Sequence, residues 1–171
     1  MTIQELGMLY TELWWKHDKK DFEGVKKTYQ KICEILGHSK DAEKIAYHVT
    51  NAYLYADLSE KNKKSYSHSL REFLKARAIL KINEKVSYAQ IKWWQAFRER
   101  NYFLTVIYIF KQQFEMVKKI NMNMLFSGYY LIRAGFSHSK RDKEKTAFWL
   151  SKYWGALLAE FKNKELIPLP I

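Results

Sequence analysis

Cysteine, proline and glycine are scarce in this sequence. Its 171 residues include one cysteine, two prolines and six glycines, and both prolines, Pro168 and Pro170, lie at the C-terminal end. The single cysteine, Cys33, cannot form a disulfide within the chain. Folds with many strands and tight hairpins need more glycine and proline at their turns. These absences exclude a disulfide-stabilised scaffold and favour a fold built from long helices.

Long hydrophobic runs are absent too. The longest extends from Tyr102 to Phe110 and is ended by Lys111, which makes it far shorter than the ~18 residues that a membrane-spanning helix requires. The first residues carry neither a basic segment nor a small-residue cleavage site of the kind found in secretory signals. We therefore expect a cytoplasmic protein with no membrane partner.

Acidic residues are few relative to basic ones. The chain has 30 lysines and arginines against 18 aspartates and glutamates, a formal net charge of +12. A surplus of this size attracts anionic partners. Lysines outnumber arginines, whereas proteins that recognise bases rely mainly on arginine. We expect an acidic protein or peptide as the partner, with nucleic acid as the alternative.

Apolar residues are plentiful and regularly spaced. They make up 47% of the chain, and aromatics alone 16%, which is enough to bury a core unaided. Their recurrence at steps of three and four indicates amphipathic helices. The spacing predicts helices over residues 3–15, 21–36, 40–58, 65–80, 87–97, 102–120, 124–135 and 141–162. The expected fold is one all-α domain of about seven to eight helices over residues 1–165, followed by an extended apolar tail, residues 166–171.

Two of these helices carry specific expectations. The segment from Tyr102 to Ile120 is apolar on nearly all sides in its first half, which predicts the most buried helix of the fold. We expect the second-to-last helix to end at Gly135, and Ser139 to cap the last helix.

Three helix starts share one pattern. An aromatic residue is followed three residues later by a small or short one, and large and small residues then alternate at helical spacing. The three sets are Phe22, Val25, Tyr29 and Ile32; Tyr66, Ser69, Phe73 and Ala76; and Tyr102, Thr105 and Ile109. This pattern resembles the second helix of a tetratricopeptide repeat, with intervals longer than that family's ~34 residues.

The resemblance implies both a fold and a function. It implies antiparallel helix pairs stacked as a short right-handed solenoid. It also implies a non-enzymatic adaptor or regulatory module that binds a protein or peptide. In such a superhelix the first helix of each pair lines the inner face. The expected binding groove is basic and aromatic, and its residues are Asn51, Tyr55, Lys92, Trp94, Arg98, Tyr129 and Arg133.

One pair of residues supports an alternative function. Arg133 and His138 have the Arg-x4-His spacing that resembles the active site of HEPN-type ribonucleases, in which the pair would clamp phosphate and transfer a proton. Here Ala134 stands where a polar residue is usual, and Gly135 lies between the two. The alternative is a nucleic-acid-associated helical protein, either a binder or such a ribonuclease.

No other pattern in the chain predicts chemistry. The five histidines do not have the spacing of a metal site, and Cys33 lies on an apolar helix stripe, where a thiol is typically buried and inert. No phosphate-binding loop or nucleophile motif occurs, so we expect no cofactor. The apolar tail, Leu166–Ile171, is a candidate contact for a homo-oligomer.

Overall fold

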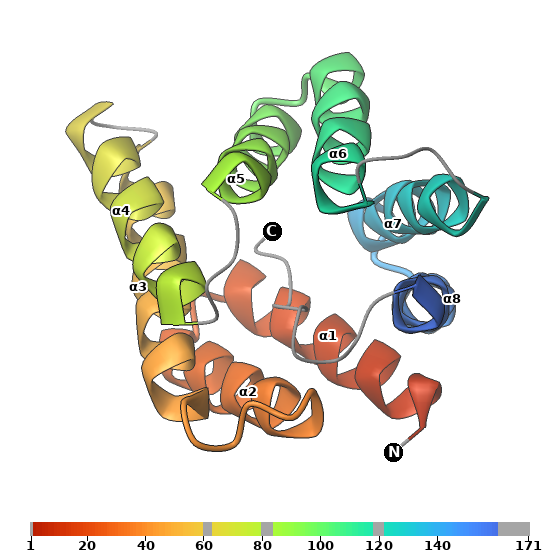
Figure 1. Ribbon diagram of the computed structural model, residues 1–171, viewed down its shortest axis with the longest axis horizontal. Coiled ribbons are helices and arrows are strands. Elements are labelled where there is room, and N and C mark those ends of the chain that lie inside the picture. The colour runs from red at the N-terminus through yellow and green to blue at the C-terminus, as the bar shows by residue number, and fades with distance from the viewer. Residues whose placement is uncertain (1, 60–62, 80–83, 118–121, 161–171) are drawn as a thin grey trace.

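The structure, a computed structural model, describes residues 2–59, 63–79, 84–117 and 122–160, with some side chains in these ranges left out. Within them the chain forms eight α-helices and no strand (Figure 1), so the predicted all-α class is confirmed. The predicted tail, residues 166–171, lies outside the described residues. The helices are α1 (Ile3–Asp18), α2 (Phe22–Ile35), α3 (Ala42–Ser59), α4 (Lys63–Ile79), α5 (Glu84–Arg98), α6 (Tyr102–Val117), α7 (Met122–Ser139) and α8 (Lys143–Glu160).

Three of the turns between helices are built in the same way. Helices α1, α5 and α7 are each followed by a basic residue with positive φ; these residues are Lys20, Arg100 and Arg141. The next residue is an aspartate or asparagine whose side chain accepts a hydrogen bond from a backbone N–H in the first turn of the following helix. Its own backbone N–H donates to a carbonyl five residues back, which closes the end of the first helix. The cation also suits the negative end of the helix dipole.

This turn corrects the expected boundary near Gly135. Helix α7 continues through Gly135 to Ser139, and the Ser139 hydroxyl donates to the Gly135 carbonyl at 3.0 Å. The cap of α8 is Asp142, which accepts from the Lys145 amide at 3.0 Å. Ser139 is therefore not the cap, because the stop signal is the left-handed residue Arg141 rather than a glycine.

The core lies mainly where α1, α2, α3 and α8 meet. Helix α1 packs against α2 on one side and against α8 on the other, so the first and last helices are neighbours (Figure 1). The largest fully buried side chains come mostly from these four helices and include Leu6, Tyr10, Leu13, Tyr29, Ile32, Ile45, Tyr53, Tyr153 and Trp154.

The contact between α1 and α8 bears on the expected solenoid. Consecutive helices do pack against each other along the chain, as stacked pairs would. In a solenoid, however, each repeat contacts only its neighbours in sequence, whereas here the two ends of the fold meet. The right-handed solenoid is not confirmed, and the tetratricopeptide resemblance stays a prediction.

A buried glycine allows α1 and α8 to approach closely. A Cβ atom on Gly7 would lie 2.8 Å from the carbonyl oxygen of Ala147 and 2.8 Å from the backbone nitrogen of Ser151, and would also overlap the Ser151 hydroxyl. A rotamer change could move the hydroxyl but not the backbone atoms. Only glycine therefore fits at this position without separating the helices.

We expect Gly7→Ala to destabilise the fold by about 1–3 kcal/mol, the usual cost of overpacking a tight contact. Gly155→Ala is the matched control, because it lies in α8 at the same interface. Its added Cβ would lie 3.7 Å from Ile3, an ordinary contact, so it should stabilise helix α8 by about 0.5–1 kcal/mol. Urea unfolding measures both changes. Equal effects would contradict the assigned close approach.

Candidate functional site

Helix α6 exposes several of its apolar residues and buries three of its polar ones. Phe103 is 76% exposed, and Ile107 and Phe114 are each 44% exposed. Their spacing of four and seven residues places them on one side of the helix. The opposite side is buried and includes Thr105, Gln112 and Gln113 together with Ile109. The prediction that this helix is the most buried one was therefore wrong.

One hydrogen bond holds the polar side of α6 against α5. The Gln112 side-chain oxygen accepts from the indole nitrogen of Trp93 in α5 at 2.7 Å, and buried polar groups with partners are inexpensive to keep in a core. The Thr105 hydroxyl donates within its own turn, to the Asn101 carbonyl at 2.8 Å, whereas the buried Gln113 amide has no hydrogen-bond partner among the described residues. Helix α6 is thus fixed to α5 partly by this polar contact, and its apolar side has no covering element among the described residues.

Exposed residues of α7 continue this surface. Met122, Leu125, Tyr129 and Phe136 are all between 38% and 60% exposed. Two contacts join the helices: the Tyr102 ring lies 5.8 Å from the Phe136 ring, and the Phe110 ring lies against Gly128 of α7. We call this surface the α6–α7 apolar face; its residues are Phe103, Ile107, Phe114, Met122, Leu125, Tyr129 and Phe136.

The α6–α7 apolar face is poor in negative charge. Between Tyr102 and Ser139 the sequence contains one carboxylate, Glu115. The described cations of the two helices lie over aromatic rings: the Lys111 ammonium is 6.0 Å from the Tyr108 ring centre, and Arg133 is 4.7 Å from that of Trp149 in α8. A partner that covers this face therefore meets apolar groups bordered by positive charge.

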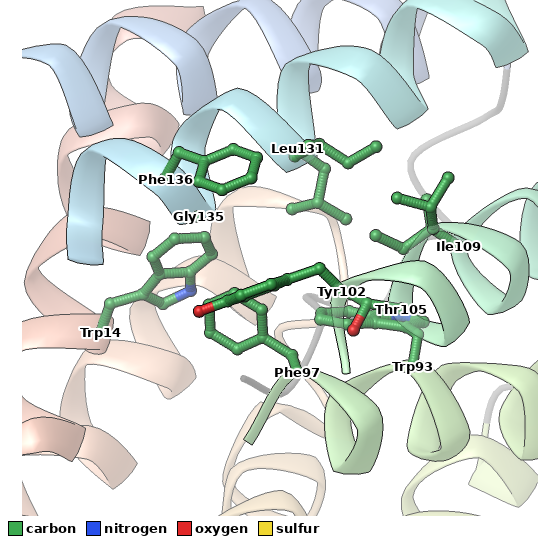
Figure 2. Close-up of a pocket in the computed structure, with 11 residues that line it drawn as sticks. Trp14, Trp93, Phe97, Tyr102, Thr105, Ile109, Leu131, Gly135 and Phe136 are labelled. Carbon is green, nitrogen blue, oxygen red and sulfur yellow. The ribbon is translucent and has the colours of Figure 1, made fainter. Parts of the chain in front are cut away.

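A small apolar cavity opens beside the face. It is lined by side chains of α1, α5, α6 and α7, and about 40 Å³ of it is free volume (Figure 2). Tyr102 and Phe136, which are about half exposed, are both at the cavity and at the end of the α6–α7 apolar face. Figure 2 also labels Trp14, Trp93, Phe97, Ile109 and Leu131 among the lining residues, and all of these except Phe97 are buried.

The expected groove residues lie in three separate parts of the molecule. Asn51 and Tyr55 are in α3, where the Tyr55 ring is 5.4 Å from the His68 ring of α4. Lys92 is in α5, with its ammonium 5.5 Å from the Tyr88 ring centre. The side chains of Trp94 and Arg98, also in α5, lie outside the described residues.

The third part of the expected groove is an exposed cluster of aromatic and cationic side chains on α7 and α8. Arg133 donates to the Tyr129 hydroxyl at 3.3 Å, and its guanidinium lies over Trp149. The Trp149 ring stacks on Tyr130 at 6.0 Å. A cation and aromatic rings thus lie together here, at the exposed residues Tyr129 and Arg133.

Arg133 and His138 have different environments. Arg133 is exposed, whereas His138 is 7% exposed and its Nε2 lies 3.0 Å from Oδ2 of Asp18 in α1. The His138 ring sits between the indoles of Trp14 and Trp15, at 5.2 and 4.4 Å. His138 thus holds the end of α7 against α1. The spacing that suggested a ribonuclease site does not bring the two side chains together at one surface.

The remaining candidate groups show no reactive arrangement. Among the described residues no group of three histidine, cysteine, aspartate or glutamate side chains could hold a metal ion. Cys33 is buried, and burial raises the pKa of its thiol, which disfavours the nucleophilic thiolate. No described helix is long and apolar enough to cross a bilayer.

Comparison with known proteins adds no family. The chain matches none of the protein-family models, curated proteins or solved structures with which it was compared. Its function must therefore be inferred from its own geometry.

One feature of the sequence indicates that α6 has a polar side and an apolar side. Thr105, Gln112 and Gln113 share one side of the segment after Tyr102 at helical spacing, so this segment has a polar side. The prediction rested instead on the first half of the segment, which is apolar on nearly all sides and therefore indicated a buried helix. Which side faces inward depends on the hydrogen bond from Trp93, a residue of another helix.

The Asp18–His138 contact predicts a pH-dependent stability. Burial, which raises the pKa of the Asp18 carboxyl, is outweighed by the hydrogen bond and charge of His138 and by the charge of Arg141, whose Nη1 lies 2.7 Å from Oδ2. The net pKa is below the ordinary value of 3.8. Because the folded-state pKa is lowered, the stabilisation is present above pH 3.8 and is lost as the pH falls through the folded-state pKa.

We expect Asp18→Asn to lower the free energy of unfolding by about 1–2 kcal/mol at pH 7, less than for a fully buried charged pair because Asp18 is partly exposed. The difference from the wild type should shrink at pH 2–3. Urea unfolding at both pH values measures it. Glu144→Gln, at an exposed position of α8, is the control and should change little. An Asp18→Asn effect that is independent of pH would contradict the assignment.

Proposed function

We propose that this protein is a non-enzymatic binding module, and that the α6–α7 apolar face binds an acidic, partly apolar segment of a protein partner. The observation that carries the proposal is the inverted orientation of α6, which buries Gln112 and Gln113 and exposes Phe103, Ile107 and Phe114. Soluble proteins rarely expose a contiguous apolar surface of this kind unless something binds it. The face extends over the length of α6 and continues onto α7.

The composition of the face suits a protein partner. Interface centres are enriched in aromatic residues and methionine, with few charges, and this face has phenylalanines, a tyrosine, a methionine and no carboxylate of its own. Full burial of a large apolar side chain contributes about 1.5–3 kcal/mol. Phe103, which is the most exposed, would gain most from being covered.

Charge favours an acidic partner segment. The chain carries a net charge of +12, and Lys111 and Arg133 flank the face. A segment with alternating apolar and acidic residues would place the first on the rings and the second beside the cations. Nucleic acid needs many phosphate contacts, and the face itself offers rings rather than a row of cations, so the acidic protein segment is the better match.

The test is to capture partners with the purified chain and with two variants. Phe103→Glu places a charge on the most exposed ring position of the face, and Tyr47→Glu makes the same change at a position of α3 that is 53% exposed. Neither residue is buried, so both variants should fold, as circular dichroism can verify. Capture is done from lysate with and without nuclease treatment and quantified by mass spectrometry.

We expect at least one captured protein to be depleted roughly tenfold or more by Phe103→Glu, the effect of losing an interface hot spot, and to be retained by Tyr47→Glu. A photo-crosslinking phenylalanine at position 103 should then join to an acidic, partly apolar segment of that protein, and the isolated segment should bind in isothermal titration. Equal capture by the wild type and Phe103→Glu, or loss of all capture on nuclease treatment, would overturn the proposal.

A further inference from the structure

The cavity between α1, α5, α6 and α7 contains one polar atom that lacks a partner. Trp14 is 3% exposed, and its indole nitrogen Nε1 has no hydrogen-bond partner in the structure. Figure 2 shows this nitrogen on the side of the indole ring that faces the other lining side chains. Burying an N–H donor without an acceptor is costly. A group that enters the cavity with a hydrogen-bond acceptor could therefore pair with the Trp14 N–H.

Two of the other polar groups at the cavity are occupied, and the third, the Tyr102 hydroxyl, belongs to a side chain that is 45% exposed. The Trp93 indole nitrogen donates to Gln112, and the Thr105 hydroxyl donates to the Asn101 carbonyl. The remaining lining is aromatic and aliphatic, with Phe97, Ile109 and Leu131 around the free space. An occupant would thus contact apolar groups on most sides, with two polar groups within the lining: the N–H donor of Trp14 and the hydroxyl of Tyr102.

The size of the space limits the occupant. The free volume of about 40 Å³ is little more than the ~30 Å³ that one water takes in the liquid, so only the tip of a larger group fits inside. Including the open mouth, the empty space amounts to about 480 Å³. A branched or cyclic group with four to six non-hydrogen atoms, roughly the size of a leucine side chain, would insert its tip and leave the rest at the mouth beside Tyr102 and Phe136.

We infer that this cavity is a binding site for a small apolar group that carries one carbonyl-type acceptor, which accepts a hydrogen bond from Trp14 Nε1. The group has two potential sources, a free small molecule or an apolar residue of the partner that covers the α6–α7 apolar face. The site rests on the cavity and on Trp14, so it stands even if the proposed protein partner is not found.

The experiment uses two probes of nearly equal shape. Cyclopentanone carries a carbonyl oxygen, and methylenecyclopentane carries a CH₂ group in its place. Binding to the full chain is followed by NMR, through the indole N–H resonance of Trp14, which is assigned from its disappearance in Trp14→Phe. We expect the ketone to move this resonance saturably and to bind about tenfold more tightly than the hydrocarbon, the factor that one buried hydrogen bond supplies.

Two glycine variants make the test specific to the cavity. A Cβ on Gly135 would lie 3.4 Å from Phe97, so Gly135→Ala fits within α7 and fills part of the cavity. It should weaken ketone binding at least fivefold while leaving the chain folded. Gly155→Ala makes the same change in α8, away from the cavity, with its nearest contact 3.7 Å away at Ile3. Ketone binding should not change in this variant.

The variant Trp14→Phe tests the contribution of the N–H donor to binding apart from that of the apolar lining. The variant keeps an aromatic ring and removes Nε1, so binding to it is followed through the methyl resonances of Ile109 and Leu131, which line the cavity. The ketone should lose its advantage over the hydrocarbon, whichever of the two affinities changes. The inference is overturned if the Trp14 resonance does not respond to the ketone, if both probes bind equally to the wild type, or if Gly135→Ala leaves ketone binding unchanged.

Partner capture identifies the source of the group. If Gly135→Ala also reduces capture of the protein crosslinked at position 103, the occupant is a residue of that partner. If capture is unchanged while ketone binding falls, the site takes a free small molecule. The ketone result does not depend on Phe103→Glu, so failure of the proposed function and failure of this site are distinguishable.

Discussion

The close contact between α1 and α8 is the constraint on which the rest of the fold depends. Gly7 lets the two helix backbones approach to a distance that no side chain would tolerate. This contact places the first helix beside the last and buries Tyr10 against Trp154, with ring centres 5.9 Å apart. At the other end of α1, Asp18 joins His138 and Arg141, so α1 is fixed along its length.

Helices α4, α5, α6 and α7 contribute fewer of the large buried side chains to the core. Helices α4 and α5 contact each other only sparsely, as do α6 and α7, whereas α1, α2, α3 and α8 hold most of the large buried side chains. Helix α6 packs on α5 partly through the hydrogen bond between Trp93 and Gln112. Its apolar residues then have no described element to cover them, and the apolar cavity lies where Trp14 reaches toward α5, α6 and α7.

The regularity of the chain resides in its turns. Lys20, Arg100 and Arg141 occupy the same left-handed position, and an aspartate or asparagine follows each to cap the next helix. Each of these turns joins two consecutive helices, α1 to α2, α5 to α6 and α7 to α8, while the tetratricopeptide resemblance stays a prediction. How the pairs pack is a separate matter, because it depends on contacts such as that of Gly7 with α8, which the turns do not encode.

The sequence by itself determined the helices, most of their boundaries and the absence of a disulfide framework, because helix formation depends on local spacing and on caps such as Asp21. It also indicated positive charge beside aromatic rings, which the structure places at Arg133, Tyr129 and Trp149. Only the tertiary structure decided which side of α6 faces solvent, because that depends on Trp93 in another helix. It likewise decided that His138 pairs with Asp18 and that Trp14 Nε1 borders a cavity, since these contacts join residues that are distant in the chain.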